Sequence, residues 1–168
     1  MKRQSGYILV GLMFIMSQSG FAADNDSFVN IRVLSAATAN KIATATEQDC
    51  KKKGYQVSVA VTDRYGNLLA FVRDPLAGAH TINVAQDKAF TAATFQGDTL
   101  SLASRLAFLK GTPRVTLFGG GVPVRAGGYV YGAVGVSGAP AEKKPGDVDH
   151  ACALKGIEAV KDELEFGE

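Results

Sequence analysis

The sequence comprises 168 residues, with 18 Lys and Arg against 16 Asp and Glu. Tryptophan is absent and no long basic run occurs, so the composition argues against a nucleic-acid-binding protein. The length suits one compact domain, and no internal repeat or linker divides the chain.

The N-terminal segment has the pattern of a signal peptide. A positively charged start precedes an apolar run over residues 7–16, which is shorter than a membrane span requires. Gly20 and Ala22 predict cleavage after Ala22, with Ala23 as the second choice, and an uncleaved membrane anchor is the alternative. We therefore expect a periplasmic or secreted protein without a membrane span, composed of a signal peptide at 1–22 and a single domain at 23–168.

The first half of the expected domain contains one helix and one hairpin. Apolar residues at helical spacing predict a helix over residues 28–53, with Ser27 as its N-cap and Gly54 as its stop. Alternating valines predict a strand over residues 55–62, and a polar turn leads to a return strand over residues 68–73.

Further helices are predicted on both sides of a short strand. Residues 81–95 are helical with an inward face of mostly alanine, which predicts close packing. Residues 99–109 form a second short helix, and residues 115–118 begin the second part of the sheet. Asp147 caps a final helix that extends to about residue 165.

Residues 119–138 are predicted to form two strands joined by a tight turn at Gly127 and Gly128. Glycine is too frequent here for an ordinary strand pair, because it weakens a strand unless another group must approach the main chain closely. The hairpin is therefore expected to be a wall against which something packs. The predicted fold is α+β, with a five-stranded antiparallel sheet, the N- and C-terminal helices on one face, and two central helices.

The two cysteines fall at the ends of the two outer helices. Cys50 lies near the end of the first helix and Cys152 near the start of the last. If these helices run antiparallel on one face, the two thiols meet. An even pair in an oxidising compartment favours a Cys50–Cys152 disulfide, and two separate buried thiols are the alternative.

Five segments of the chain resemble one protein family. They are YQVSVAVTDRYG at 55–66, AQDKAFTA at 85–92, GGGVPV at 119–124, GAVGVSG at 132–138 and DHACALKGI at 149–157. In this order they are similar to the GlcG/HbpS-like heme-binding family, and the second matches its A-x-x-K-A-x-T-A helix. The resemblance covers roughly residues 28–162 and implies a profilin-like fold, self-association as a homo-oligomer, and heme binding in some members.

The resemblance places a heme pocket between the loop at His80, the helix with Lys88, and a glycine-rich strand. His80 is the expected iron ligand, and a water-exposed or helix-capping loop histidine is the alternative. His150 is interpreted as a surface histidine. The strand residues assigned to the pocket are Gly119, Gly120, Gly121 and Val122.

Two residue types in this pocket have a second interpretation. Lys88 is expected either to contact an anionic group such as a propionate, or to pair with a carboxylate of the protein, for which Asp63 is the candidate. Phe90, Phe95 and Phe118 are candidates to line a porphyrin pocket, with ordinary core packing as the alternative.

Three classes of function follow. The first is an exported heme-binding protein that senses or handles heme or iron. The second is an enzyme that acts on a small carboxylated metabolite, an anionic ligand, in the same pocket, and the third is an oligomeric partner protein without a ligand. Binding is favoured over catalysis, because no nucleophile motif and no general base stands out in the sequence.

Overall fold

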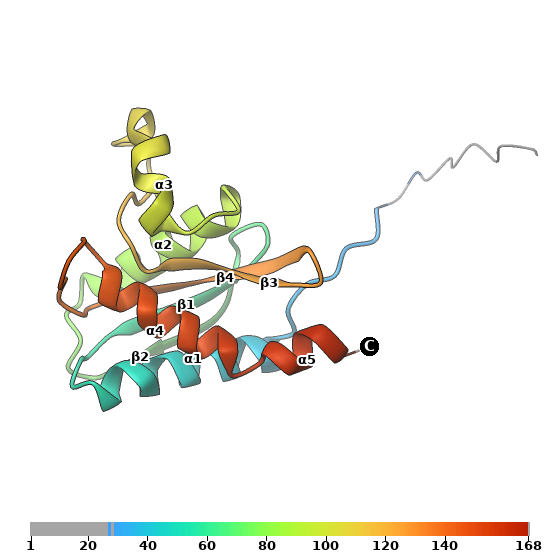
Figure 1. Ribbon diagram of the computed structural model, residues 1–168, viewed down its shortest axis with the longest axis horizontal. Helices are drawn as coiled ribbons and strands as arrows, with labels where there is room; N and C mark the ends of the chain where they lie inside the picture. The colour runs from blue at the N-terminus through green and yellow to red at the C-terminus, as the bar shows by residue number, and fades with distance from the viewer. Residues whose placement is uncertain (1–26, 28, 168) are drawn as a thin grey trace, which may run out of the picture. The chain divides into compact units, whose positions relative to one another are not determined.

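A four-stranded antiparallel sheet is the centre of the fold. The computed structural model describes Ser27 and residues 29–167, so the predicted signal peptide lies outside the described residues. The strands are β1 (Ser58–Asp63), β2 (Leu68–Arg73), β3 (Gly121–Ala126) and β4 (Tyr129–Ser137). Their order is β2-β1-β4-β3, and each neighbouring pair is antiparallel (Figure 1).

Helices cover both faces of this sheet. They are α1 (Ala36–Lys52), α2 (Thr81–Thr94), α3 (Thr99–Arg105), the 3-10 helix η1 (Ala107–Leu109), α4 (Asp147–Glu158) and α5 (Lys161–Phe166). The helices α1 and α4 pack against each other on one face, and α2 packs on the other face (Figure 1). The α+β class and the antiparallel sheet are confirmed. No helix among the described residues is long and apolar enough to cross a membrane.

The two sides of the sheet are packed differently. Toward α1 and α4 the sheet presents a valine layer, composed of Val59, Val61, Val122, Val124, Val134 and Val136, with Val57 just before β1. Toward α2 the contacts are made by small residues, which are Ala60, Ala85, Ala89, Ala92, Ala93 and Ala133. Small side chains let the helix axis approach the sheet, as the alanine pattern of α2 predicts.

The glycine-rich hairpin is confirmed, and the group that approaches it is the protein's own backbone. The turn residues Gly127 and Gly128 have φ of 53° and 82°, which suits glycine. A Cβ at Gly135 would lie 1.9 Å from the carbonyl oxygen of Ala85 in α2. The close packing inferred from the glycines is therefore explained at this position by a helix and requires no ligand.

The sheet has four strands and not five, so the strand predicted at residues 115–118 is wrong. Arg114 has φ +65°, which turns the chain away from strand geometry. The hydroxyl of Thr91 in α2 lies 3.1 Å from the Arg114 carbonyl oxygen, and it accepts a 2.9 Å bond from the Thr116 amide. These side-chain bonds to a helix replace the ladder bonds that a fifth strand would need.

Several predicted helix boundaries are also corrected. Ser27 is not an N-cap: α1 begins at Ala36, and the side chain of Ser35 accepts a 3.1 Å bond from the Thr38 amide. The final helix is divided into α4 and α5, with Val160 buried at the break. The helix expected over 99–109 is α3 followed by η1. For the first and the last helix, the periodic pattern continues past the hydrogen-bonded segment, which is limited by the Ser35 cap and by the buried Val160.

Candidate functional site

The structure divides the predicted heme-site residues between the interior and the surface. Lys88 is fully buried, and Gly119, Gly120, Gly121 and Val122 are buried with it, although β3 includes only the last two of these four. Phe90 is half-buried, and His80 is exposed. In this conformation a ligand can reach His80 and the exposed part of Phe90, but not the buried residues.

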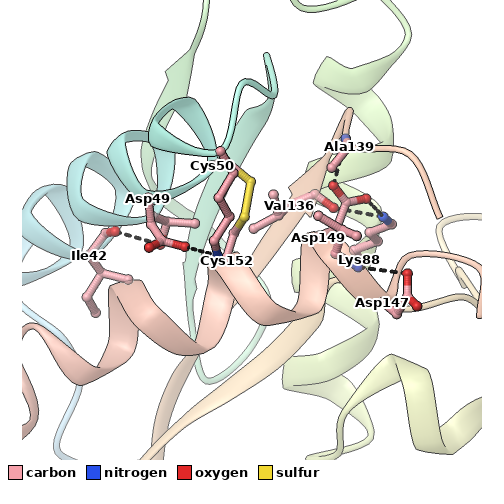
Figure 2. Close-up of a disulfide and its surroundings, with 12 residues drawn as sticks. Ile42, Asp49, Cys50, Lys88, Val136, Ala139, Asp147, Asp149 and Cys152 are labelled. Carbon is pink, nitrogen blue, oxygen red and sulfur yellow. Dashed lines mark hydrogen bonds and ion pairs between the residues drawn. A yellow bond between two sulfur atoms is a disulfide. The ribbon is translucent and has the colours of Figure 1, made fainter. Parts of the chain in front are cut away.

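Lys88 is one half of a buried ion pair. Its Nζ atom lies 2.7 Å from Oδ2 of Asp149 and donates a 2.8 Å bond to the Val136 carbonyl oxygen (Figure 2). The other carboxylate oxygen of Asp149 accepts a 3.0 Å bond from the Ala139 amide. The two side chains are 0% and 4% exposed. The carboxylate partner of Lys88 is therefore Asp149 from α4, and not Asp63.

Burial acts on both members of the pair. Desolvation lowers the pKa of Lys88, and the attraction of Asp149 opposes that shift. Desolvation likewise raises the pKa of Asp149, and Lys88 opposes it. Removing either charge would leave the other one buried without a counter-ion, which is among the most unfavourable states inside a protein.

The glycine segment and Phe118 complete the environment of the ammonium. Gly120 has φ +111°, and a Cβ there would lie 2.8 Å from Lys88 Nζ and 2.6 Å from the Val136 carbonyl oxygen. The Phe118 ring covers the ammonium, with its centroid 4.8 Å from Nζ, an arrangement typical of a cation–π contact. Glycine at position 120 is therefore needed to admit Lys88 itself.

The ion pair lies beside the disulfide that the sequence predicts. Cys50 and Cys152 are bonded, with Cα atoms 5.6 Å apart, so this prediction is confirmed. Cys152 follows Asp149 by three residues, so both lie on one side of α4 (Figure 2). The disulfide joins α4 to α1, and the ion pair joins α4 to Lys88 of α2 on the opposite side of the sheet.

The two histidines occupy different environments. His80 precedes α2, is exposed, and makes no capping bond through its side chain. Along α2 it is about 12 Å from the level of Lys88, since an α-helix rises about 1.5 Å per residue. His150 is half-buried, its Nδ1 has no hydrogen-bond partner among the described residues, and burial lowers its pKa against the opposing charge of Asp98.

An apolar groove of about 450 Å³ lies between α3, η1 and the segment that precedes β3. We call it the Phe118 groove, and it is lined by Ala103, Ala107, Lys110, Gly111, Val115, Thr116, Leu117 and Phe118. Its size falls within the range of small-molecule and cofactor sites. Phe118 is therefore both a wall of the groove and the cover of the Lys88 ammonium.

Most of this arrangement has no direct signal in the sequence. Asp149 is recognisable as an acid in the DHACALKGI segment, yet its partner is 61 positions away. The Phe118 groove forms only where α3 and η1 pack beside the segment that precedes β3, and that packing has no local sequence pattern. No group of three or more His, Cys, Asp and Glu side chains in the described part of the chain is arranged to hold a metal ion.

The comparisons with known proteins agree with the fold and the motifs. A family model described as "Haem degrading protein HbpS-like" matches residues 34–158. This chain belongs to the HbpS-like family. The resemblance noted in the sequence is thereby confirmed.

Relatives of this HbpS-like chain have been found by sequence and by structure. Protein GlcG of Escherichia coli K12 is 37% identical over 110 residues, which are 62% of this chain and 81% of GlcG. The crystal structure of HbpS matches with a TM-score of 0.74 and 37% identity, covering 83% of this chain and 98% of that one. The crystal structure of a PduOC–heme complex shares the fold, with a TM-score of 0.66 and 24% identity over 76% of this chain and 94% of that one.

Proposed function

We propose that this HbpS-like chain is an exported heme-binding protein that senses or handles heme or iron. The family description names heme, and a structure with the same fold is a heme complex. The observation that carries the proposal is the Phe118 groove, which has an apolar lining, a cofactor-sized volume and a cation, Lys110, among its residues. A porphyrin needs apolar surface for its ring and cationic partners for its propionates.

The residues of this chain fit heme in distinct roles. The aromatic ring of Phe118 and the side chains of Val115 and Leu117 remove a flat apolar ligand from water. Lys110 is the groove cation that we assign to a propionate. Lys88 is already paired with Asp149, so in this proposal it does not bind the ligand and instead holds the Phe118 ring in place through the contact of its ammonium with the ring.

When bound, heme would supply an iron centre that takes ligands from the protein. Of the two histidines, His80 would be the iron ligand, because its side chain is exposed and makes no capping bond, whereas His150 is half-buried. His80 is not among the residues that line the Phe118 groove, so the His80→Ala titration tests this assignment separately from the groove.

We also propose export and self-association. A disulfide such as Cys50–Cys152 persists in an oxidising compartment, which supports the signal-peptide prediction for residues 1–22. Mass spectrometry of the protein recovered from the periplasm tests export, and an intact Met1 there would contradict it. Light scattering tests self-association, and a monomer mass at micromolar concentration would contradict that part.

Heme titration followed in the Soret region tests the binding proposal. We expect His80→Ala to shift the Soret band and weaken binding, and His150→Ala to do neither. Leu117→Asp places a charge in the Phe118 groove and is expected to weaken binding. Leu154→Asp on the exposed face of α4 is its matched control. The absence of a Soret shift when the parent protein is mixed with micromolar heme refutes heme binding, and binding by Leu117→Asp that equals the parent refutes the groove.

A further inference from the structure

A second, polar cleft of about 550 Å³ lies between the β1–β2 turn and α2. Its polar lining is Asn67, Asn83, Gln86, Asp87 and Arg114, and it shares no residue with the Phe118 groove. Asn83, Gln86 and Asp87 are spaced by three and four positions, so they form one stripe on α2 beside its alanine face. We call this the Arg114 cleft.

The backbone of Arg114 is held in an unusual conformation. Its φ of +65° is one that residues with a side chain rarely adopt. The Thr91 hydroxyl of α2 accepts a 2.9 Å bond from the Thr116 amide, which fixes this turn to the helix. Uncommon backbone conformations persist where the surrounding contacts over-determine them, and they are concentrated at binding and catalytic sites.

The guanidinium of Arg114 stacks on an aromatic ring of α2. It lies over the Phe90 ring, 4.1 Å from the centroid. Phe90 is held in turn by the β1–β2 turn, where a Cβ on Gly66 would lie 2.6 Å from the ring. A guanidinium stacked on an aromatic ring keeps its edges available for planar, two-point recognition of a carboxylate.

The hydrogen bonds around the cleft leave donors and acceptors available for a ligand. Nε of Arg114 points to Oδ1 of Asp87 at 3.4 Å, which leaves the terminal nitrogens without a described partner. The amide nitrogen of Asn67 donates to Asp63, and that of Gln86 donates to the Ile82 carbonyl. Their amide oxygens therefore remain as acceptors, and Asp87 disfavours a second negative charge.

We propose that the Arg114 cleft binds a small hydroxylated monocarboxylate. The ligand's carboxylate pairs with the terminal nitrogens of Arg114, and its hydroxyl groups donate to acceptors of the cleft, which are the amide oxygens of Asn67 and Gln86 and the free oxygen of Asp87. This site is separate from the proposed heme site and does not depend on it.

The test uses the heme-free full-length protein and three probes, which are glycerate, glycerol and inorganic phosphate. Nuclear magnetic resonance follows the Arg114 Nε–H signal and the side-chain amides of Asn83 and Gln86. We expect glycerate to shift these signals, glycerol to leave them unchanged, and phosphate to bind at least about tenfold more weakly than glycerate.

Variants separate recognition from folding. Arg114→Gly removes the guanidinium and suits a φ of +65°, so it should fold and bind glycerate at least about tenfold more weakly. Arg114→Lys keeps the charge without the planar fork and should also bind more weakly. Arg64→Ala is the control, because Arg64 stacks on Tyr65 in the same turn but does not line the cleft.

Three results would overturn the proposal. These are the absence of any shift at millimolar glycerate, phosphate affinity equal to that of glycerate, and unchanged glycerate affinity in both Arg114 variants. None of them bears on heme, because heme binding is read from the Soret band in a separate titration.

Discussion

Substituting one member of the Lys88–Asp149 pair is expected to destabilise the protein strongly. Lys88→Met keeps the length of the side chain but leaves the Asp149 carboxylate without its counter-ion, at 4% exposure. It also leaves the Val136 carbonyl oxygen without its donor. Asp149→Asn keeps the shape of the side chain and instead leaves the Lys88 ammonium buried without a counter-ion.

The expected size follows from burial and not from bond length. Breaking a buried pair by removing one partner costs about 3–5 kcal/mol of unfolding free energy. Lys155 and Glu158 form a surface pair of nearly equal length, 2.6 Å against 2.7 Å, with side chains 59% and 62% exposed. Such exposed pairs contribute little to the free energy of unfolding, so Lys155→Met is the matched control.

Urea unfolding of the oxidised protein at neutral pH measures these costs, and thermal melting repeats the comparison. For a domain of this size we expect the melting temperature to fall by roughly 6–20 °C in each single Lys88 or Asp149 variant. The double variant Lys88→Met with Asp149→Asn should cost less than the sum of the two single variants, because no unpaired charge remains. Additive costs, or single variants that cost no more than Lys155→Met, would refute the reasoning.

Two further predictions concern α4. Replacing Cys50 and Cys152 by serine opens a loop of 102 residues, and the chain-entropy model gives a loss of up to about 4.7 kcal/mol, checked by urea unfolding. Unchanged stability would contradict it. Amide donors from Glu142, Lys144, Lys143 and Val148 lower the pKa of Asp147 to about 2. The stability that the Asp147 carboxylate contributes is therefore complete above its ordinary pKa of 3.8 and is lost as the pH falls toward 2. Melting temperatures measured at several pH values check this, and Asp147→Asn should make them depend less on pH in that range.

The sequence alone was sufficient for features set by neighbouring residues. The alanine face of α2, the turn at Gly127 and Gly128, and the antiparallel hairpins follow from short periodic patterns. The disulfide was also predictable, because the signal-peptide pattern indicated an oxidising compartment and the two cysteines lie at helix ends that were expected to meet.

Tertiary structure decided the features that depend on distant partners. Whether residues 115–118 extend the sheet was determined by the Thr91 hydroxyl of α2, which bonds to the backbone around them. The partner of Lys88 was determined by the position of α4, and a carboxylate nearer in sequence was the natural guess. Periodicity predicts which face of an element is buried, but hydrogen bonds and ion pairs join specific atoms, and those atoms meet only after the elements have packed.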